Sequence, residues 1–125
     1  MNLKILILIG ILILAGISFP VQAEKVNPEI TLISIYDNYQ VDPELKTAWG
    51  FATIIKTPQD IILFDAGGNS KILLSNMENL GINPASIKKV VISHIHGDHL
   101  GGLEGFLEKN NNVTGFHSQF LPQIC

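Results

Sequence analysis

The sequence predicts an α/β fold in which strands come first and then alternate with helices. Three observations indicate this class. Segments rich in β-branched residues occupy positions 30–36, 49–56 and 60–65. Apolar residues at helical spacing follow in positions 69–81 and again from 100 to 109, and a short apolar run at Val90–Ile92 lies between them. This order is typical of a layered α/β domain, and 125 residues permit one domain at most.

The first segment has the pattern of a secretory signal peptide. Lys4 is followed by an uncharged run from Ile5 to Phe19 and then by small residues before a cleavage point after Ala23. At 15 residues the run is shorter than the roughly 20 that span a bilayer. We therefore expect residues 1–23 to be cleaved and the protein to be exported, periplasmic or secreted, with no stable membrane contact. The alternative is an uncleaved N-terminal anchor.

The charge balance argues against nucleic acid as a partner. The chain has 8 basic and 11 acidic residues, which gives a net charge of −3. Removing residues 1–23 makes it −4, because Lys4 is the only charge in that segment. All basic residues are lysines, so no arginine can bind a phosphate in bidentate fashion. The single cysteine, Cys125, has no partner for an internal disulfide. We expect a small-molecule substrate.

The strands are predicted from alternation and turn signals. Residues 30–36 alternate and form the first strand, and residues 37–47 form a loop. Segments 49–56 and 60–65 form a hairpin with Pro58 in its turn. The second of these strands ends at Asp65-Ala66-Gly67-Gly68, where glycines let the backbone approach other groups closely.

Cap residues mark the helices. Asn69 and Ser70 are N-cap candidates for a helix with one apolar face, and Gly81 ends it; that face carries Leu73, Met77 and Leu80. Asn83-Pro84 repeats the start signal before the strand Val90–Ile92. A last helix is predicted through Lys109 from the spacing of Leu100, Leu103 and Leu107.

Directly after the strand Val90–Ile92, three of the four histidines and an aspartate lie within six residues. In an extended continuation of this strand, His94 and His96 point to the same side, where one metal ion can contact both. Gly97 lets the chain turn without a Cβ penalty, so Asp98 and His99 can form a second group of ligands nearby. Zinc accepts imidazole and carboxylate ligands, and no thiolate of a structural zinc site is near. The motif predicts two adjacent metal positions; the alternative is a histidine-rich polar loop.

The residues His94-Ile95-His96-Gly97-Asp98-His99 resemble the HxHxDH signature of the metallo-β-lactamase superfamily. Upstream, Leu63-Phe64-Asp65-Ala66-Gly67 resembles the family's strand ending in Asp-Thr-Gly, with Ala66 in place of threonine. Tyr36-Asp37-Asn38 and Trp49-Gly50-Phe51 resemble a subgroup that includes dihydropterin-phosphate synthase-like enzymes. The superfamily resemblance covers about residues 30 to 113.

This resemblance implies the N-terminal half of an αβ/βα sandwich, in which two similar halves pack sheet to sheet. It implies a metal-dependent hydrolase that uses a metal-activated hydroxide, with two zinc ions in a complete domain; manganese and iron are the alternatives. His94 and His96 would hold one ion, and Asp98 and His99 the second. Asp98 would also be the catalytic residue that transfers protons, and Asp65 would support a metal-bound imidazole.

The resemblance also makes Asp37 and Asn38 candidates for the pocket wall, because the equivalent loop of this family lies over the metal site. The alternative is that both residues make side-chain-to-backbone turns.

Residues 113–125 lack clear periodicity, although the resemblance leads us to expect a further strand and more domain beyond Val113. His117 and Cys125 are the only further candidate ligands in this tail. We therefore expect residues 24–125 to form a partial, truncated domain. Two alternatives to an active hydrolase stay open: a catalytically inactive metal-binding remnant, and an interaction module anchored in the membrane by its N-terminal segment.

Overall fold

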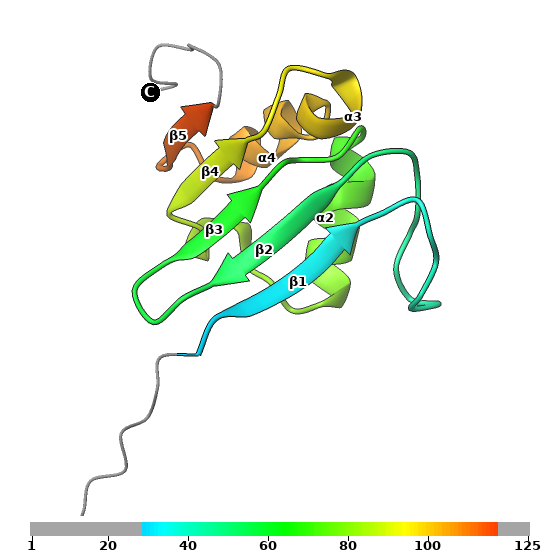
Figure 1. Cartoon of the computed structure of the whole chain (residues 1–125), viewed down its shortest axis with the longest axis horizontal. Helices are drawn as coiled ribbons and strands as arrows, with labels where there is room; N and C mark the ends of the chain where they lie inside the picture. The colour runs from blue at the N-terminus through cyan, green and yellow to red at the C-terminus, as the bar shows by residue number, and fades with distance from the viewer. Residues whose placement is uncertain (1–28, 118–125) are drawn as a thin grey trace, which may run out of the picture.

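The computed structural model describes residues 29–117, in which five strands form one sheet with helices on one face (Figure 1). The strands lie side by side in sequence order, β1-β2-β3-β4-β5. Their bounds are Thr31–Tyr36 (β1), Ala52–Lys56 (β2), Ile61–Phe64 (β3), Lys89–Ile92 (β4) and Thr114–His117 (β5). The first three strands are antiparallel, whereas β3, β4 and β5 are parallel to one another. The predicted α/β class is confirmed.

The helices connect the parallel strands and cover one face of the sheet, behind it in Figure 1. Their bounds are Ser70–Asn79 (α2), Gly97–Leu100 (α3) and Leu103–Lys109 (α4), with a short 3-10 helix at Pro84–Ser86 (η1). The core lies between these helices and the sheet, and its fully buried side chains include Ile35, Ile54, Leu63, Leu73, Met77 and Phe106. Burying such side chains is the main stabilising contribution to the fold.

Local signals set the ends of α2 as predicted. The side chain of Asn69 accepts hydrogen bonds from the backbone N–H groups of Lys71 and Ile72, which caps the N-terminus. Gly81 has a φ of 64° beyond the C-terminus, a left-handed conformation that favours glycine. Leu73 and Met77 are fully buried on the face toward the sheet. The apolar stripe of this helix is therefore core.

The other face of the sheet is apolar. Alternation along the strands places Leu32, Ile55 and Phe64 on this face, and the register pairs Leu32 with Ile55. Leu32 is 66% exposed, and no helix within residues 29–117 covers it. A sheet covered on one face only agrees with the expected half of a two-layered sandwich.

Five strand ends differ from the prediction, three of them by one residue at the start of β1, β3 and β4, and the other two have a backbone cause. β2 begins at Ala52 instead of Trp49, because Gly50 has a φ of 135° and the chain bends there. The backbone N–H of Phe51 donates to the carbonyl of Asp98. β3 ends at Phe64, because Asp65 has a φ of 57°, which takes the chain out of the extended region.

The predicted last helix is two helices. α3 and α4 are separated by a turn at Gly101-Gly102, and a Cβ on Gly102 would overlap the carbonyl of Ala66. The expected role of Gly97 was wrong: it begins α3 without a positive φ, and a Cβ on it would meet no atom within 4 Å. Close backbone packing therefore requires glycine at position 102 and not at position 97.

The tail contains the further strand that the family resemblance led us to expect beyond Val113, although the tail's own sequence pattern did not indicate it. Thr114–His117 pair with β4 in parallel, and the register aligns His117 with Ile92. The expectation of an irregular tail from residue 113 is therefore wrong for these four residues. The predicted signal peptide at residues 1–23 and the candidate ligand Cys125 lie outside the described residues. Between residues 29 and 117, no helix has the length and apolar character needed to cross a bilayer.

Candidate metal centre

The candidate centre lies where β3 and β4 end. These strands are parallel neighbours, with Phe64 aligned with Val91, so the residues that follow each strand emerge at the same edge of the sheet. The backbone N–H of Asp65 donates to the carbonyl of Val91 at 2.8 Å, which extends the pairing by one step. Asp65 thereby lies beside the histidine motif, although 28 positions separate it from Ser93.

Asp65 is 1% exposed and is held by several hydrogen bonds. Its Oδ1 accepts from the backbone N–H of Ser93 at 2.7 Å. Its Oδ2 lies 2.8 Å from the Ser93 hydroxyl and 2.7 Å from Nδ1 of His99. A buried carboxylate needs such partners, because burial without them is strongly unfavourable. Asp65 contacts an imidazole, as its predicted role requires; metal binding by that imidazole stays a prediction.

The three motif histidines lie close together. The ring centroid of His94 is 4.6 Å from that of His96 and 4.1 Å from that of His99. The segment between His94 and His96 is not the extended continuation of β4 that we expected. Residues 93–95 bend, and the backbone N–H of His96 donates to the carbonyl of His94 at 3.1 Å. The two rings approach each other because the chain turns tightly here.

Asp98 lies in α3 next to His99, and its Oδ2 is 3.6 Å from Nε2 of His99. This distance exceeds that of a direct hydrogen bond. The backbone of Asp98 is fixed from another segment: its carbonyl accepts from Phe51, and a Cβ on Gly50 would overlap the same oxygen. The Trp49-Gly50-Phe51 segment thus packs directly against the histidine motif.

The chemistry of these side chains fits a metal ion in part. Imidazole nitrogens and carboxylate oxygens are zinc ligands, and because Nδ1 of His99 bonds to Asp65, Nε2 is the nitrogen of that ring left for a metal; it lies 3.6 Å from Oδ2 of Asp98. However, no group of three or more His, Cys, Asp or Glu side chains within residues 29–117 is arranged so that it could hold an ion. The structure therefore brings the predicted ligands together as neighbours, without a complete coordination shell among them.

The loop before β2 is tied down by side-chain-to-backbone bonds. Asp37 Oδ1 accepts from the backbone N–H of Tyr39 at 3.0 Å, and Asn38 Oδ1 accepts from that of Gly50 at 2.8 Å. The turn-forming alternative is therefore confirmed for Asp37, whereas Asn38 bonds to a residue twelve positions away and makes no such turn. Asn38 also reaches the candidate centre indirectly, because Gly50 packs against the carbonyl of Asp98.

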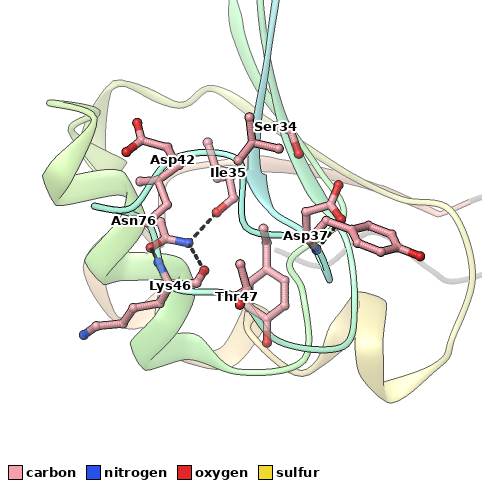
Figure 2. Close-up of a pocket in the computed structure, with 11 residues that line it drawn as sticks. Ser34, Ile35, Asp37, Asp42, Lys46, Thr47 and Asn76 are labelled. Atoms are coloured by element: carbon pink, nitrogen blue, oxygen red, sulfur yellow. Dashed lines mark hydrogen bonds between the residues drawn. The ribbon is translucent and has the colours of Figure 1, made fainter.

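A cavity of about 270 Å³ lies between β1, this loop and α2 (Figure 2). Asp37 lines it, and none of the motif histidines does. The buried Asn76 side chain lies at its wall, where Figure 2 shows its hydrogen bonds to Ile35 and Lys46. The amide of Asn76 thus joins α2 to β1 and to the loop that borders the cavity.

Tyr36 lies beneath the turn that carries Asp65. Its ring packs so closely against Gly67 that a Cβ there would overlap it. Burial raises the pKa of the Tyr36 hydroxyl above its ordinary value of 10.0, and hydrogen bonds from the backbone of Gly68 and Asn69 offset part of this effect. The tyrosine therefore supports the 65–69 turn as a neutral group.

Sequence reasoning missed Ser93. It lies directly after β4, contacts Asp65 through both its backbone and its hydroxyl, and contacts Nδ1 of His94 through the same hydroxyl at 2.8 Å. The one available signal was a hydroxyl residue between a strand end and the first histidine of the motif.

The family is established by comparison with known proteins. The model of the metallo-beta-lactamase superfamily matches residues 50–122. This chain belongs to that superfamily, whose members are metal-dependent.

Similar proteins illustrate the range of the superfamily. The chain is 46% identical over 50 residues to 7,8-dihydropterin-6-methyl-4-(beta-D-ribofuranosyl)-aminobenzene-5'-phosphate synthase of Methanocaldococcus jannaschii, with 40% of this chain and 17% of that protein covered. It is 40% identical over 57 residues to ribonuclease Z of Pyrococcus furiosus, covering 46% of this chain and 18% of the relative. A metallo-beta-lactamase structure from Cronobacter sakazakii, described by a HARLDQ motif, matches with a TM-score of 0.50 and 26% identity over 67% of this chain and 32% of that one. The matched segment is thus a minor part of each of these proteins.

Proposed function

We propose that this chain supplies metal ligands to a metallohydrolase centre, with His94 and His96 serving one zinc ion and Asp98 and His99 a second. The observation that carries this proposal is the buried carboxylate of Asp65 bonded to Nδ1 of His99 at 2.7 Å. A carboxylate behind an imidazole orients the ring and raises its basicity, as the partners of metal-binding histidines do. A histidine-rich surface loop would have no need of such a support.

The proposed reaction is hydrolysis. A metal ion held by these side chains would lower the pKa of a bound water molecule to roughly 7 and would polarise the substrate's carbonyl or phosphoryl oxygen. Asp98 is the candidate for taking the proton from that water and returning it to the leaving group. Hydrolysis would consume one water molecule, whose oxygen would stay on the acyl or phosphoryl product and whose proton would leave with the released group.

The charge of this chain, and not its relatives, favours a small-molecule substrate, because one of those relatives is a ribonuclease. The net charge of −3 and the absence of arginine favour a small molecule over nucleic acid. Esters, thioesters, amides, lactones and phosphoesters are all compatible with this chemistry. The similarity to the synthase of Methanocaldococcus jannaschii adds pterin-linked substrates to this range.

A second candidate function is metal binding without catalysis. The finding that no three His, Cys, Asp or Glu side chains among residues 29–117 form a group able to hold an ion counts against a complete catalytic centre within this range. An active centre then needs ligands from outside this range or from another polypeptide. Both candidate functions use the histidine motif to bind metal, and only the first predicts that the chain hydrolyses a substrate.

Elemental analysis of the purified chain tests the proposal. We expect bound zinc in the unaltered chain and its loss in the His94→Ala, His96→Ala double variant. Glu78→Gln is the matched control, because Glu78 is an exposed acid on α2 and should leave the metal content unchanged. A folded, zinc-treated sample without bound metal would contradict metal binding. Bound metal without hydrolysis of simple esters would favour the second candidate.

Export is a further part of the proposal. The N-terminal segment supports cleavage after Ala23 and a periplasmic or secreted location. Mass spectrometry of the protein from its native compartment checks this, because cleavage leaves 102 residues, whereas an anchored form keeps all 125.

A further inference from the structure

The hydrogen bonds around His94 lead through Ser93 to Asp65. The Ser93 hydroxyl oxygen is 2.8 Å from Oδ2 of Asp65 and 2.8 Å from Nδ1 of His94. The backbone N–H of Ser93 donates to the other carboxylate oxygen at 2.7 Å, which fixes the serine against the aspartate. The second histidine, His99, reaches Oδ2 of Asp65 directly.

Counting protons gives a direction to each of these bonds. An ionised carboxylate only accepts hydrogen bonds, and a serine hydroxyl has one proton to donate. The proton of Ser93 must therefore point to Asp65. The same oxygen can then only accept from His94, so Nδ1 of His94 carries the hydrogen. In a neutral imidazole this leaves Nε2 without a proton and with a free lone pair.

The same count applies to His99. Its Nδ1 lies 2.7 Å from Oδ2 of Asp65, so Nδ1 donates and Nε2 has the lone pair. One buried carboxylate thus sets the same tautomer in two rings, directly in His99 and through a hydroxyl in His94. His96 is different: it is exposed, and no hydrogen bond to its ring is found within residues 29–117.

The position of Asp65 explains why this arrangement is firm. Asp65 has a φ of 57°, a conformation that a non-glycine residue adopts only where its surroundings hold it. The backbone N–H of Asp65 donates to Val91 and that of Ala66 donates to the carbonyl of His99 at 2.7 Å. The backbone at Asp65 is therefore fixed relative to both β4 and α3, and the carboxylate cannot turn away from the histidines without losing its bonds to Ser93.

We propose that Ser93 is a positioning residue, which transmits the acceptor character of Asp65 to His94 and holds that ring as the Nδ1–H tautomer with Nε2 open to a metal ion. The use of that lone pair rests on the function proposed above, whereas the tautomer itself is a property of the metal-free chain. The proposal involves no change in the charge of either ring. In this proposal the Asp65 carboxylate sets the tautomer of one histidine at each of the two proposed metal positions.

The test is nitrogen NMR of the metal-free full chain labelled with 15N-histidine, at a pH at which the 15N shifts show the rings to be neutral. Protonated and unprotonated ring nitrogens have well-separated 15N shifts, and single His→Gln variants assign each ring. We expect His94 and His99 to be Nδ1–H tautomers and His96 to show the mixture of a solvated imidazole. An Nε2–H tautomer for His94 in the unaltered chain would overturn the proposal.

Two substitutions separate positioning from general damage. Ser93→Ala should shift His94 toward the solvated mixture and leave His99 unchanged, whereas Ser93→Thr, which keeps the hydroxyl, should restore the His94 tautomer. If Ser93→Ala leaves His94 as in the unaltered chain, the serine has no such role. If Ser93→Ala does not fold, the His94 tautomer measured in the unaltered chain and in Ser93→Thr still tests the proposal.

A zinc titration separates this proposal from the proposed function. With zinc alone as the probe, Ser93→Ala should bind about tenfold more weakly than the unaltered chain, the lower end of the effect of losing a hydrogen-bond partner behind a metal ligand, and Ser93→Thr should recover the affinity. An unaltered chain that shows the expected tautomers and binds no zinc would refute the proposed function and leave the tautomer assignment standing.

Discussion

The buried amide of Asn76 should be among the most sensitive positions of the chain. Its Nδ2 donates to the carbonyls of Ile35 and Lys46, and its Oδ1 accepts from the backbone N–H of Lys46, all at 2.8 Å (Figure 2). Asn76→Ala removes these three bonds, each of which contributes about 1 kcal/mol net. Alanine recovers roughly 0.6 kcal/mol in helix propensity, so we expect a loss of about 2–3 kcal/mol in the free energy of unfolding.

Asn79→Ala on the same helix is the matched control. Asn79 is exposed and makes one bond, from Nδ2 to the carbonyl of Glu44, and its replacement gains the same helix propensity. We expect this variant to lie within about 0.5 kcal/mol of the unaltered chain, because surface substitutions have small effects. Urea unfolding followed by far-UV circular dichroism measures both variants.

The outcome that would refute the reasoning is an Asn76→Ala variant no less stable than Asn79→Ala. A third variant, Asn76→Asp, keeps the size of the side chain and places a carboxylate against two carbonyl oxygens. It should be at least as unstable as Asn76→Ala if the hydrogen bonds are the cause, and close to the unaltered chain if only the volume matters.

Three further predictions concern packing, pH and a surface ion pair. Gly102→Ala should lower the free energy of unfolding by about 1–3 kcal/mol, because the new Cβ would overlap a backbone carbonyl. Gly97→Ala has open space at its Cβ and should be neutral or up to about 1 kcal/mol more stable. Urea unfolding of both variants measures the difference. Burial raises the pKa of Tyr36, so its contribution to stability is full below pH 10.0 and is lost as pH rises through the folded pKa. When the pH is raised above 10.0, the free energy of unfolding should therefore fall less in Tyr36→Phe than in the unaltered chain. Lys89→Ala removes a partly exposed ion pair with Asp60, whose atoms are 2.6 Å apart. It should lower the free energy of unfolding by no more than about 1 kcal/mol at low salt, and a larger loss would contradict the expected behaviour of an exposed ion pair.

The secondary structure was predictable where the signals are local. The limits of α2 follow from Asn69 and Gly81, which act within one turn of the helix ends. The strands of the antiparallel part follow from alternation, because side chains of neighbouring strands must share a face. The prediction of a helix start at Asn83-Pro84 also depended on adjacent residues alone, and the 3-10 helix η1 begins at Pro84.

The places where the prediction failed depend on contacts between distant segments. The break between α3 and α4 follows from the close approach of Gly102 to Ala66, and the start of β2 follows from the bond between Phe51 and Asp98. β5 has four residues and little pattern of its own, and pairing with β4 defines it. Periodicity within a segment contains no information about such partners.

The sequence by itself determined the α/β class, the superfamily and the histidine-rich motif, because caps, alternation and the order of ligand-type residues are properties of short segments. Only the tertiary structure decided what supports the motif. It placed Asp65 beside Ser93 by aligning two parallel strands, bent the chain so that the rings of His94 and His96 meet, and left one face of the sheet uncovered by any helix of residues 29–117. These features depend on the packing of segments far apart in the chain, which local chemistry does not specify.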